Sequence, residues 1–319
     1  MSDQHPATGR SYCCQPSAAD IATAADQPSQ PSSRSKGGNS NDPALAAGVE
    51  LTRGYSVIRL LDRSRNLEVY EVWSQERECR CVAKTVRRSR QHHRRLVARV
   101  LNEGRYLESF THPHLVRAYE TIELPTAILI LEALPGQTLD HLIDTIRRPI
   151  PARSIGILGL HLCSAIQYLH RHNVLHLDLK PSNIICSQGL AKILDLSLAG
   201  PPRSVDPGCG TKGYLPPEHA RGGMTTTAAD VWGIGIVLYE TATGQRPFAH
   251  EEPRHQHPQL TTRAPCVRTR RPRLPRCLST IIDSCLEPDP PNRPTVAQVT
   301  STLSEVVPNS IGPQRPAVV

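Results

Sequence analysis

Short runs of alternating apolar and polar residues, rich in β-branched and aromatic side chains, fill the chain from residue 55 to residue 132. This alternation is typical of half-buried strands, and it predicts five of them, over residues 55–61, 67–73, 80–86, 115–122 and 127–132. Between the third and fourth strands the spacing changes to three or four residues, at Leu96, Val100, Glu103 and Leu107. That spacing places the four residues on one face of a helix that ends near Phe110.

Beyond residue 136 the pattern becomes mostly helical. Apolar residues recur at helical spacing from Ile155 to Leu169, and residues 228–241 are apolar on nearly every face, which predicts a buried helix. The remaining expected elements are a hairpin of residues 184–186 with 191–194 and short helices over 277–287 and 295–306.

Composition limits how much of the 319-residue chain can fold. Residues 1–50 are mostly small or polar and contain one aromatic residue, so they cannot bury enough apolar surface to offset the entropy of ordering. We predict that they form a disordered tail and that the proline-rich residues 308–319 are loose. The folded domain is then expected over residues 51–307.

Composition also excludes several classes of protein. No apolar run reaches the roughly 18 residues of a membrane helix, and the start of the chain lacks the basic and apolar regions of a signal peptide. The ten cysteines are scattered, which argues against a disulfide scaffold and favours a cytoplasmic location. The net charge of +8 permits acidic partners without specifying one.

Glu103 is the first candidate for chemistry, because it lies within an apolar helical stripe. A buried carboxylate needs a partner, and Lys84 is the candidate: it is one of only five lysines in the chain and lies on a preceding apolar strand. The alternative is that Glu103 lies at the edge of the stripe and reaches solvent.

A second candidate is the loop from His176 to Asn183. It contains a carboxylate, an ammonium and an amide within six residues, at Asp178, Lys180 and Asn183, and Asp195 follows the next predicted hairpin. Phosphoryl transfer needs such groups: a base, a cation for the migrating charge, and oxygen ligands for Mg²⁺. A lone aspartate at position 195 could equally be a turn or cap residue.

These motifs occur in the order found in one family, and the chain resembles eukaryotic-type serine/threonine protein kinases, including those of bacteria, over about residues 55–307. The matching segments are Val82-Ala83-Lys84 with Glu103, His176-Leu177-Asp178 with Lys180 and Asn183, Asp195-Leu196-Ser197, Pro216-Pro217-Glu218, Asp230 to Gly235, Gly244 to Phe248, and Asn292-Arg293-Pro294.

The resemblance implies an α+β, two-lobed protein-kinase-like fold. A small N-lobe of about residues 51–132 would hold a five-stranded antiparallel sheet and one helix, and a larger, mostly helical C-lobe would cover about residues 136–307. Residues 131–134 would connect the lobes. Glu218 and Arg293 would form a structural ion pair.

The resemblance also implies ATP and Mg²⁺, or Mn²⁺, as cofactors and serine or threonine hydroxyls of proteins as acceptors. Lys84, oriented by Glu103, would hold the α- and β-phosphates, Asp178 would accept or orient the proton of the substrate hydroxyl, and Lys180 would neutralise the γ-phosphate. Asn183 and Asp195 would bind the metal, and Thr211 would line the hydroxyl site. The residues expected around the adenine are Leu61, Val69, Val82, Glu132, Leu134 and Ile185.

Two departures from the family bear on activity. Residues 62–69, aligned with the glycine-rich phosphate loop, contain no glycine. Side chains forced into glycine conformations there would cost on the order of 1–3 kcal/mol, or roughly ten- to a hundredfold in ATP affinity or rate. Leu177 replaces the arginine that grips a phosphorylated activation loop in many relatives, so we expect activity that does not depend on phosphorylation of Ser204 or Thr211.

Two other functions remain possible. The missing glycines and the Asp-Leu-Ser triplet are compatible with an inactive pseudokinase scaffold. The basic residues 87–95 could bind nucleic acid, but no aromatic residue interrupts them, so a solvated face is the preferred interpretation. His250, His255 and His257 fit no standard zinc spacing, and Cys79 and Cys81 are expected on opposite faces of a strand. The sequence indicates no oligomeric state.

Overall fold

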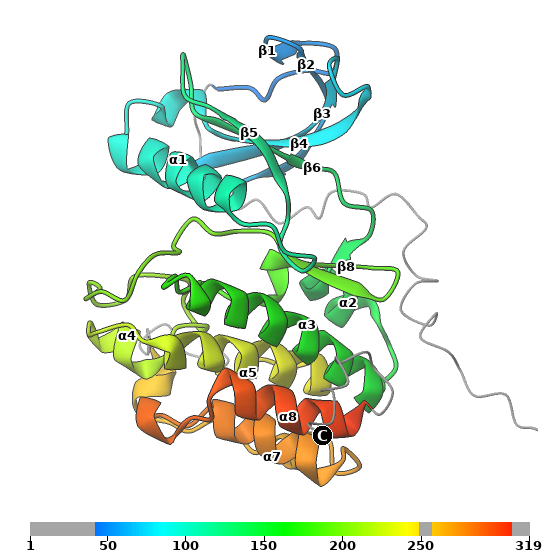
Figure 1. The fold of residues 1–319 in the computed structure, drawn as a ribbon, viewed down its shortest axis with the longest axis vertical. Helices are drawn as coiled ribbons and strands as arrows, with labels where there is room; N and C mark the ends of the chain where they lie inside the picture. Colours follow the sequence, from blue (N-terminus) through cyan, green and yellow to red (C-terminus); the bar gives the residue numbers. More distant parts are fainter. Residues whose placement is uncertain (1–41, 249–256, 308–319) are drawn as a thin grey trace, which may run out of the picture.

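The computed structural model describes residues 42–248 and 257–307, which form a smaller and a larger lobe joined after residue 132 (Figure 1). In the described part of the smaller lobe the sheet has six antiparallel strands in the order β1-β2-β3-β4-β6-β5. They are β1 (Glu50–Thr52), β2 (Tyr55–Arg63), β3 (Leu67–Ser74), β4 (Cys79–Val86), β5 (Ala118–Ile122) and β6 (Ile128–Glu132).

Two details of this sheet differ from the prediction. The additional strand is the three-residue β1, which reverses into β2 through Gly54 at φ +82°, a backbone conformation that glycine adopts without strain. β5 begins at Ala118 and not at residue 115, because the chain at Leu115 and Val116 bonds instead to Ile193 of the larger lobe.

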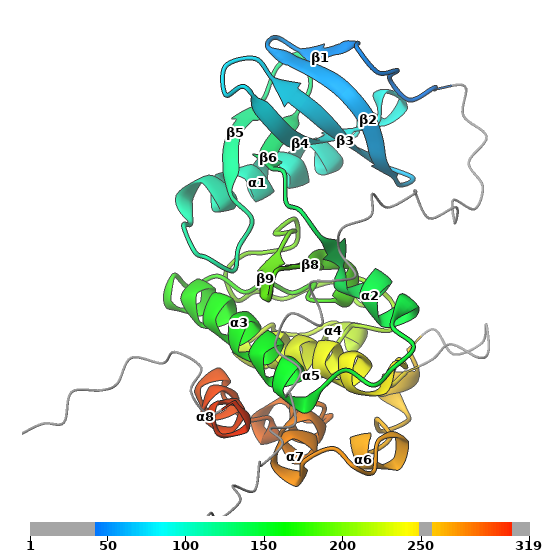
Figure 2. The same ribbon diagram turned by 90° about the vertical axis from the view of Figure 1, so that its right-hand side faces the viewer.

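Helix α1 (Arg94–Ser109) packs against β4, β5 and β6, on the side of the sheet toward the larger lobe (Figures 1 and 2). Val100, Glu103, Gly104 and Leu107 are its buried residues. Three of them are those that the helical spacing predicts, whereas Leu96, the fourth predicted residue, is half-buried. Gly104 is required by close packing, since a Cβ there would lie 2.0 Å from the hydroxyl oxygen of Thr121. The apolar stripe of α1 therefore faces the sheet and brings Glu103 with it.

Residues 42–49 run across the opposite face of the sheet. The backbone nitrogen of Leu45 donates to the hydroxyl of Tyr70, Gly48 bonds to Val57, and Asp42 accepts hydrogen bonds from Arg63 and Ser89. The tail predicted over residues 1–50 therefore differs in its last nine residues, which contact the folded lobe. Residues 1–41 and 308–319 of the predicted tails lie outside the described residues.

The larger lobe is built around α5 (Thr227–Thr243), which is buried from Ala229 to Ala242. α3 (Ala152–Arg171) packs against both α5 and α8 (Val296–Val306). The other described elements are helices α2 (Leu139–Thr145), α4 (Pro217–Arg221), α6 (Val267–Arg270) and α7 (Arg276–Cys285), a small sheet of β7 (Gln137–Thr138), β8 (Ile184–Ser187) and β9 (Leu190–Ile193), and short 3₁₀ turns.

One hydrophobic core continues through both lobes. It includes Val100 and Leu107 of α1, Leu129 of β6, and Ile166 and Leu303 of the larger lobe. A second, smaller core around Tyr70 lies on the outer face of the sheet. The small sheet with β8 and β9 lies between the first sheet and α3 in Figure 2, so the loops at its ends face the inner side of the smaller lobe.

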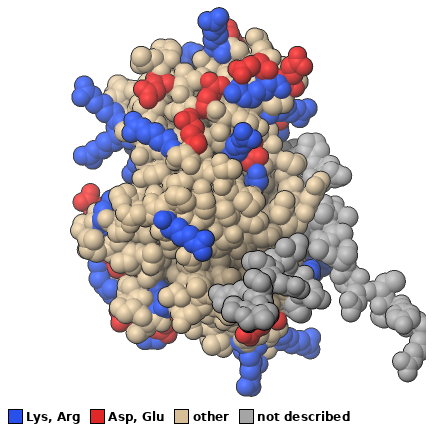
Figure 3. Space-filling view, viewed as in Figure 1, with Lys and Arg blue, Asp and Glu red and all other residues tan. Residues whose placement is uncertain are grey.

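Among the described residues, no helix is both long enough and apolar enough to cross a membrane. The basic residues 87–95 lead into α1, and most of them are exposed. In Figure 3 lysine and arginine side chains project from the smaller lobe at the level of α1, whereas the middle of this face is largely uncharged.

Candidate active site

Lys84 brings together two acidic residues that are far apart in the sequence. Its Nζ lies 2.7 Å and 2.9 Å from the two carboxylate oxygens of Glu103 and 3.1 Å from Oδ2 of Asp195. Lys84 is 8% exposed and Glu103 is fully buried. The predicted partnership of Lys84 with Glu103 is therefore confirmed, and the alternative of a solvent-exposed Glu103 is wrong.

Burial and neighbouring charges shift the pKa values of all three side chains. Burial alone would lower the pKa of Lys84, but the carboxylates of Glu103 and Asp195 outweigh burial and raise it. Burial would likewise raise the pKa of Asp195, yet Lys84 and the backbone N–H of Ser197 hold it well below its usual range. Burial and the nearby Asp195 raise the pKa of Glu103 to about 8, although Lys84 opposes the shift. At neutral pH Lys84 is therefore a cation beside the ionised Asp195, and Glu103 is the member of the group that takes up a proton most readily.

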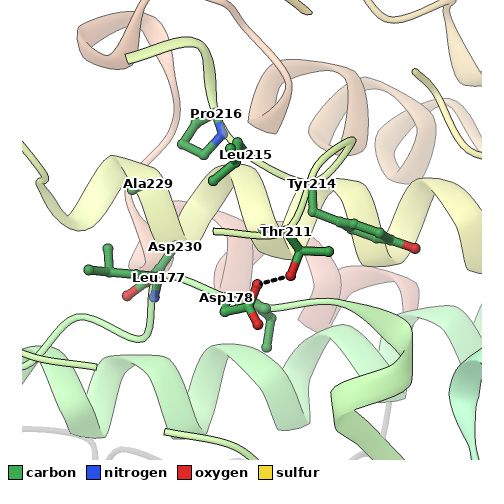
Figure 4. A pocket seen from close by; sticks show the side chains of 10 residues that line it. Leu177, Asp178, Thr211, Tyr214, Leu215, Pro216, Ala229 and Asp230 are labelled. Carbon is green, nitrogen blue, oxygen red and sulfur yellow. Dashed lines mark hydrogen bonds between the residues drawn. The ribbon is translucent and has the colours of Figure 1, made fainter. Parts of the chain in front are cut away.

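A second cluster surrounds Asp178 in the larger lobe (Figure 4). Lys180 Nζ lies 2.6 Å from Oδ2 of Asp178 and donates to Oγ1 of Thr211 at 2.7 Å, and Thr211 Oγ1 donates to Oδ1 of Asp178 at 2.6 Å. Leu179, Tyr214 and other side chains line a small pocket at this point. The loop from His176 to Asn183 and the segment around residue 211, some 30 residues later, thus meet at one carboxylate.

Asp230 of α5 holds the loop from His176 to Asn183 through hydrogen bonds to its backbone. Its carboxylate accepts hydrogen bonds from the backbone N–H groups of His176 and Leu177, at 2.9 Å and 2.8 Å, and contacts Nε2 of His170 at 2.8 Å. Leu177 has φ +67°, an uncommon conformation for a leucine that costs free energy. The buried carboxylate of Asp230 therefore stabilises a strained turn immediately before Asp178.

Asn183 and Asp195 offer the oxygen atoms that Mg²⁺ prefers. The Asn183 Nδ2 donates to the backbone oxygen of Asp178 at 3.0 Å, so the amide group is turned with its nitrogen toward the loop and its oxygen is left available. The backbone nitrogen of Leu194 donates to the backbone oxygen of Asn183, which holds the two segments side by side. The donor set, an amide oxygen and a carboxylate, fits Mg²⁺. Among the described residues no group of three or more His, Cys, Asp or Glu is arranged to hold a metal.

The predicted adenine site is lined from both lobes. Val82 and Lys84 are two residues apart on β4 and therefore share a face of the sheet, and Val69 of β3 pairs directly with Lys84. Leu61, Val69, Val82, Leu134 and Ile185 are all only half-buried. Their partial exposure is compatible with an apolar surface that a ligand covers.

Glu132 has a different environment from the one expected of a nucleotide-binding side chain. Its Oε1 lies 2.5 Å from Nζ of Lys192 and accepts from the backbone nitrogen of Arg117 at 2.8 Å. Lys192 is on β9, so this ion pair joins the two lobes at their connection. The sequence analysis did not assign Lys192 a role, although its rarity as a lysine in an arginine-rich chain was an available signal.

The phosphate loop corrects the expectation of strain. β2 and β3 meet in a tight turn in which Ser64 Oγ accepts from the backbone nitrogens of Asn66 and Leu67 and donates to the oxygen of Leu67. Within the described loop residues 62–69 no φ is positive. The serine side chain and a backbone hydrogen bond from Ser64 N–H to the oxygen of Leu67 close the turn, so this loop does not need the conformations that only glycine adopts easily.

Two further predictions can be compared with the structure. Glu218 and Arg293 form the expected buried ion pair, with two contacts of 2.7 Å and 2.8 Å. The expectation for Cys79 and Cys81 is wrong: their sulfurs lie 3.9 Å apart, because residues two apart in a strand point to the same face. Of the three histidines considered for metal, His250 and His255 lie outside the described residues.

Comparisons with known proteins agree with this geometry. The family model described as "Protein kinase domain" matches residues 55–303. The chain is 31% identical over 233 residues, 68% of its length, to serine/threonine-protein kinase PkaA of Streptomyces coelicolor, and 30% identical over 240 residues, 69% of its length, to PknB of Mycobacterium tuberculosis. These matches cover only 41% and 37% of the two relatives.

Solved structures show the same fold. The kinase domain of PknI from Mycobacterium tuberculosis superposes with a TM-score of 0.66 at 20% identity, over 83% of this chain and all of that domain. The predicted fold class, with an antiparallel sheet and a helix in the N-lobe and a mostly helical C-lobe, is therefore confirmed. Protein kinases generally use ATP and Mg²⁺. The chain belongs to the protein kinase family.

Proposed function

We propose that the chain transfers the γ-phosphate of Mg·ATP to serine or threonine hydroxyls of protein substrates. The observation that carries the proposal is the contact of Lys84 with both Glu103 and Asp195, within a fold that also brings Lys180 and Thr211 to Asp178. A scaffold that only binds partners has no need for these groups to be assembled.

Each residue has a role that follows from its contacts. Lys84, held by Glu103, would bind the α- and β-phosphates. Asn183 and Asp195 would hold Mg²⁺, which offsets the charge of the phosphate oxygens when it is bound. Lys180 would stabilise the negative charge on the transferred group.

Asp178 would orient the acceptor hydroxyl and take its proton. The hydroxyl of Thr211 already donates to Oδ1 of Asp178 at 2.6 Å. This contact shows that the carboxylate accepts from an aliphatic hydroxyl of the kind that serine and threonine substrates present. An incoming hydroxyl would take the place of, or share, this hydrogen bond.

The adenine would lie between the half-buried side chains of Val69 and Val82 above and Ile185 below. Leu61 and Leu134 would close the sides of this site. Because Lys192 engages the side chain of Glu132 and the backbone nitrogen of Glu132 donates to the oxygen of Arg117, the part of Glu132 that would contact a nucleotide is its backbone oxygen.

The test is phosphate transfer from labelled ATP, with Mg²⁺ or Mn²⁺, by the purified protein and by two variants. Asp178→Asn keeps the shape of the side chain and removes its charge, and we expect it to lower transfer at least about a hundredfold. Asp144→Asn changes an exposed aspartate of α2 in the same way and is expected to retain wild-type activity.

A pseudokinase scaffold is the second candidate, favoured by the absence of glycine from the phosphate loop. Equal incorporation in wild type and Asp178→Asn, or none in either, would support the scaffold and refute the proposed transfer. A cytoplasmic location and protein substrates are part of the same proposal. Because the chain matches less than half the length of the curated relatives, the substrates and partners of the whole protein are proposals as well.

A further inference from the structure

The activation segment, residues 195–218, is attached to the loop that precedes α5. The backbone nitrogen of Thr225 donates to the backbone oxygen of Arg203 at 2.9 Å, and the Thr225 hydroxyl accepts from the backbone nitrogen of Arg203 at 3.0 Å. The same hydroxyl lies 3.0 Å from the oxygen of Arg203. Thr225 is fully buried. The two residues thus bond through both backbone groups of Arg203.

The attachment continues on the next residues. The backbone nitrogen of Val205 donates to the oxygen of Gly223 at 3.1 Å, and Ser204 and Met224 form an antiparallel bridge. In Figure 1 this part of the segment lies at the edge of the larger lobe, beside α4. Two short stretches of extended chain therefore pair, with the Thr225 hydroxyl closing one end.

The side chain of Arg203 folds back along the segment. Its Nη2 donates to the backbone oxygen of Leu198 at 2.8 Å, and its Nη1 lies 3.4 Å from the oxygen of Pro201. Space for the guanidinium exists because residue 200 is glycine: a Cβ there would lie 2.3 Å from Nη1. The backbone of Gly200 also pairs with Leu175, at the start of the catalytic loop.

These contacts, which we call the Arg203–Thr225 clasp, connect two functional positions. Leu198 is three residues after Asp195, which contacts Lys84, and Thr211 is eight residues after Arg203 and contacts Asp178. Fixing residue 203 to both Leu198 and Thr225 therefore shortens the free chain on each side of the clasp. A shorter loop has less conformational entropy to lose when it is ordered.

We propose that Arg203 and Thr225 are positioning residues that hold the activation segment in its substrate-accepting conformation without a phosphate group on the segment. The proposal rests on the proposed phosphotransfer function. Leu177 offers no cation to a phosphorylated side chain, and the backbone bonds of the clasp provide the order that such a contact would otherwise supply.

The main test compares Thr225→Val, which removes the hydroxyl at nearly constant volume, with Thr225→Ser, which retains it. Thr225→Val leaves the buried N–H of Arg203 without a partner, so we expect hydrogen exchange of residues 198–210 to accelerate roughly tenfold and the KM for a peptide substrate to rise by a similar factor. The KM for ATP should change less than about twofold, and Thr225→Ser should behave as the wild type.

Arg203→Met gives an independent measurement if Thr225→Val does not fold, because it removes the guanidinium contacts with Leu198 and Pro201 from a half-buried side chain and leaves the backbone bonds to Thr225 in place. It should also accelerate exchange of residues 198–210 and raise the peptide KM. Ser204→Ala is the matched control, since the exposed Ser204 side chain contacts only the sulfur of Met224. It should leave exchange and both KM values unchanged.

Phosphatase treatment provides the last measurement. Equal activity of the wild type before and after treatment supports the clasp, and loss of most activity would overturn it. Unchanged exchange in both Thr225→Val and Arg203→Met would also overturn it. Hydrogen exchange does not depend on catalysis, so a protein that transfers no phosphate but shows the expected exchange would refute the proposed function and support the clasp as a structural device.

Discussion

In the proposed function the catalytic loop of the larger lobe and the phosphate loop of the smaller lobe would contact the same part of a nucleotide, yet only one retains the side chains of the family. Asp178, Lys180 and Asn183 are present and in mutual contact. The phosphate loop has replaced its glycines with a turn closed by Ser64. The difference lies in which atoms act: the catalytic loop works through side chains, whereas a phosphate loop works through its backbone.

A backbone function tolerates sequence change if another arrangement gives the same path of the chain. Ser64 supplies hydrogen bonds that stabilise the turn from within, and the N-terminal residues support it from outside through the contact of Asp42 with Arg63. A carboxylate that accepts a proton has no such substitute. The comparison therefore predicts large effects at charged side chains and small effects in the phosphate loop.

The largest effect is expected for Lys84→Met. Loss of the ammonium should lower kcat/KM for ATP at least about a hundredfold, and the buried Glu103 left without a partner should destabilise the protein by about 3 kcal/mol. Steady-state kinetics and chemical denaturation measure the two quantities.

The double variant Lys84→Met/Glu103→Leu separates stability from activity. It should recover part of the lost free energy of unfolding, since the fully buried carboxyl group of Glu103 is gone and only the half-buried Asp195 still lacks its cation, while phosphate transfer stays low. If the double variant regained phosphate transfer, Lys84 would contribute only to stability. The predicted contrast between charged side chains and the phosphate loop would then be wrong.

An intermediate effect is expected for Ser64→Ala in the phosphate loop. The change removes three hydrogen bonds from an exposed turn, each worth about 0.5–1 kcal/mol at most, so the KM for ATP should rise by roughly threefold to tenfold with kcat little changed. Ser109→Ala, which removes an exposed hydroxyl at the end of α1, is the control. An effect as large as that of Lys84→Met would mean that the turn contributes to catalysis as strongly as the charged side chains.

The smallest expected effect is a dependence of the free energy of unfolding on pH. Burial lowers the pKa of both His112 and His161 to about 4, and the nearby His114 adds to the shift. Because the unfolded chain takes up protons below about pH 6.5 while the folded chain does not, the free energy of unfolding should decrease as the pH falls from about 6.5 toward 4.

Both histidines are partly exposed, so solvent screening should limit the loss to about 1 kcal/mol at pH 5.5, or roughly 2–4 °C in Tm. Thermal unfolding of the wild type and of His161→Gln at pH 7.5 and 5.5 measures it, and the variant should lose less. An equal loss in both proteins would assign the effect to other groups. The shifts of Lys84 and Asp195 lie outside this range, so these two side chains should remain charged throughout.

Most of the helices and strands of the fold followed from local patterns. The stripe of α1 and the apolar α5 were readable because burial of one face, or of all faces, leaves a periodic trace in the sequence. Strand β1 could not be predicted from the sequence, because three residues are too few to show alternation. The contacts of residues 42–49 could not be predicted either, since a polar segment that forms hydrogen bonds through its backbone resembles any other polar segment in sequence.

The sequence by itself determined which side chains can do chemistry. A lysine in an arginine-rich chain, a glutamate in an apolar stripe and an aspartate, lysine and asparagine within six residues required no coordinates, because their chemical types and local spacing are properties of the sequence. Only the tertiary structure decided how distant segments meet: Lys84 with Asp195, Glu132 with Lys192, and Arg203 with Thr225. Such contacts depend on the path of the intervening chain, which no local pattern reveals. The contact of Arg203 with Thr225 is hidden further, because it uses backbone atoms that every residue possesses.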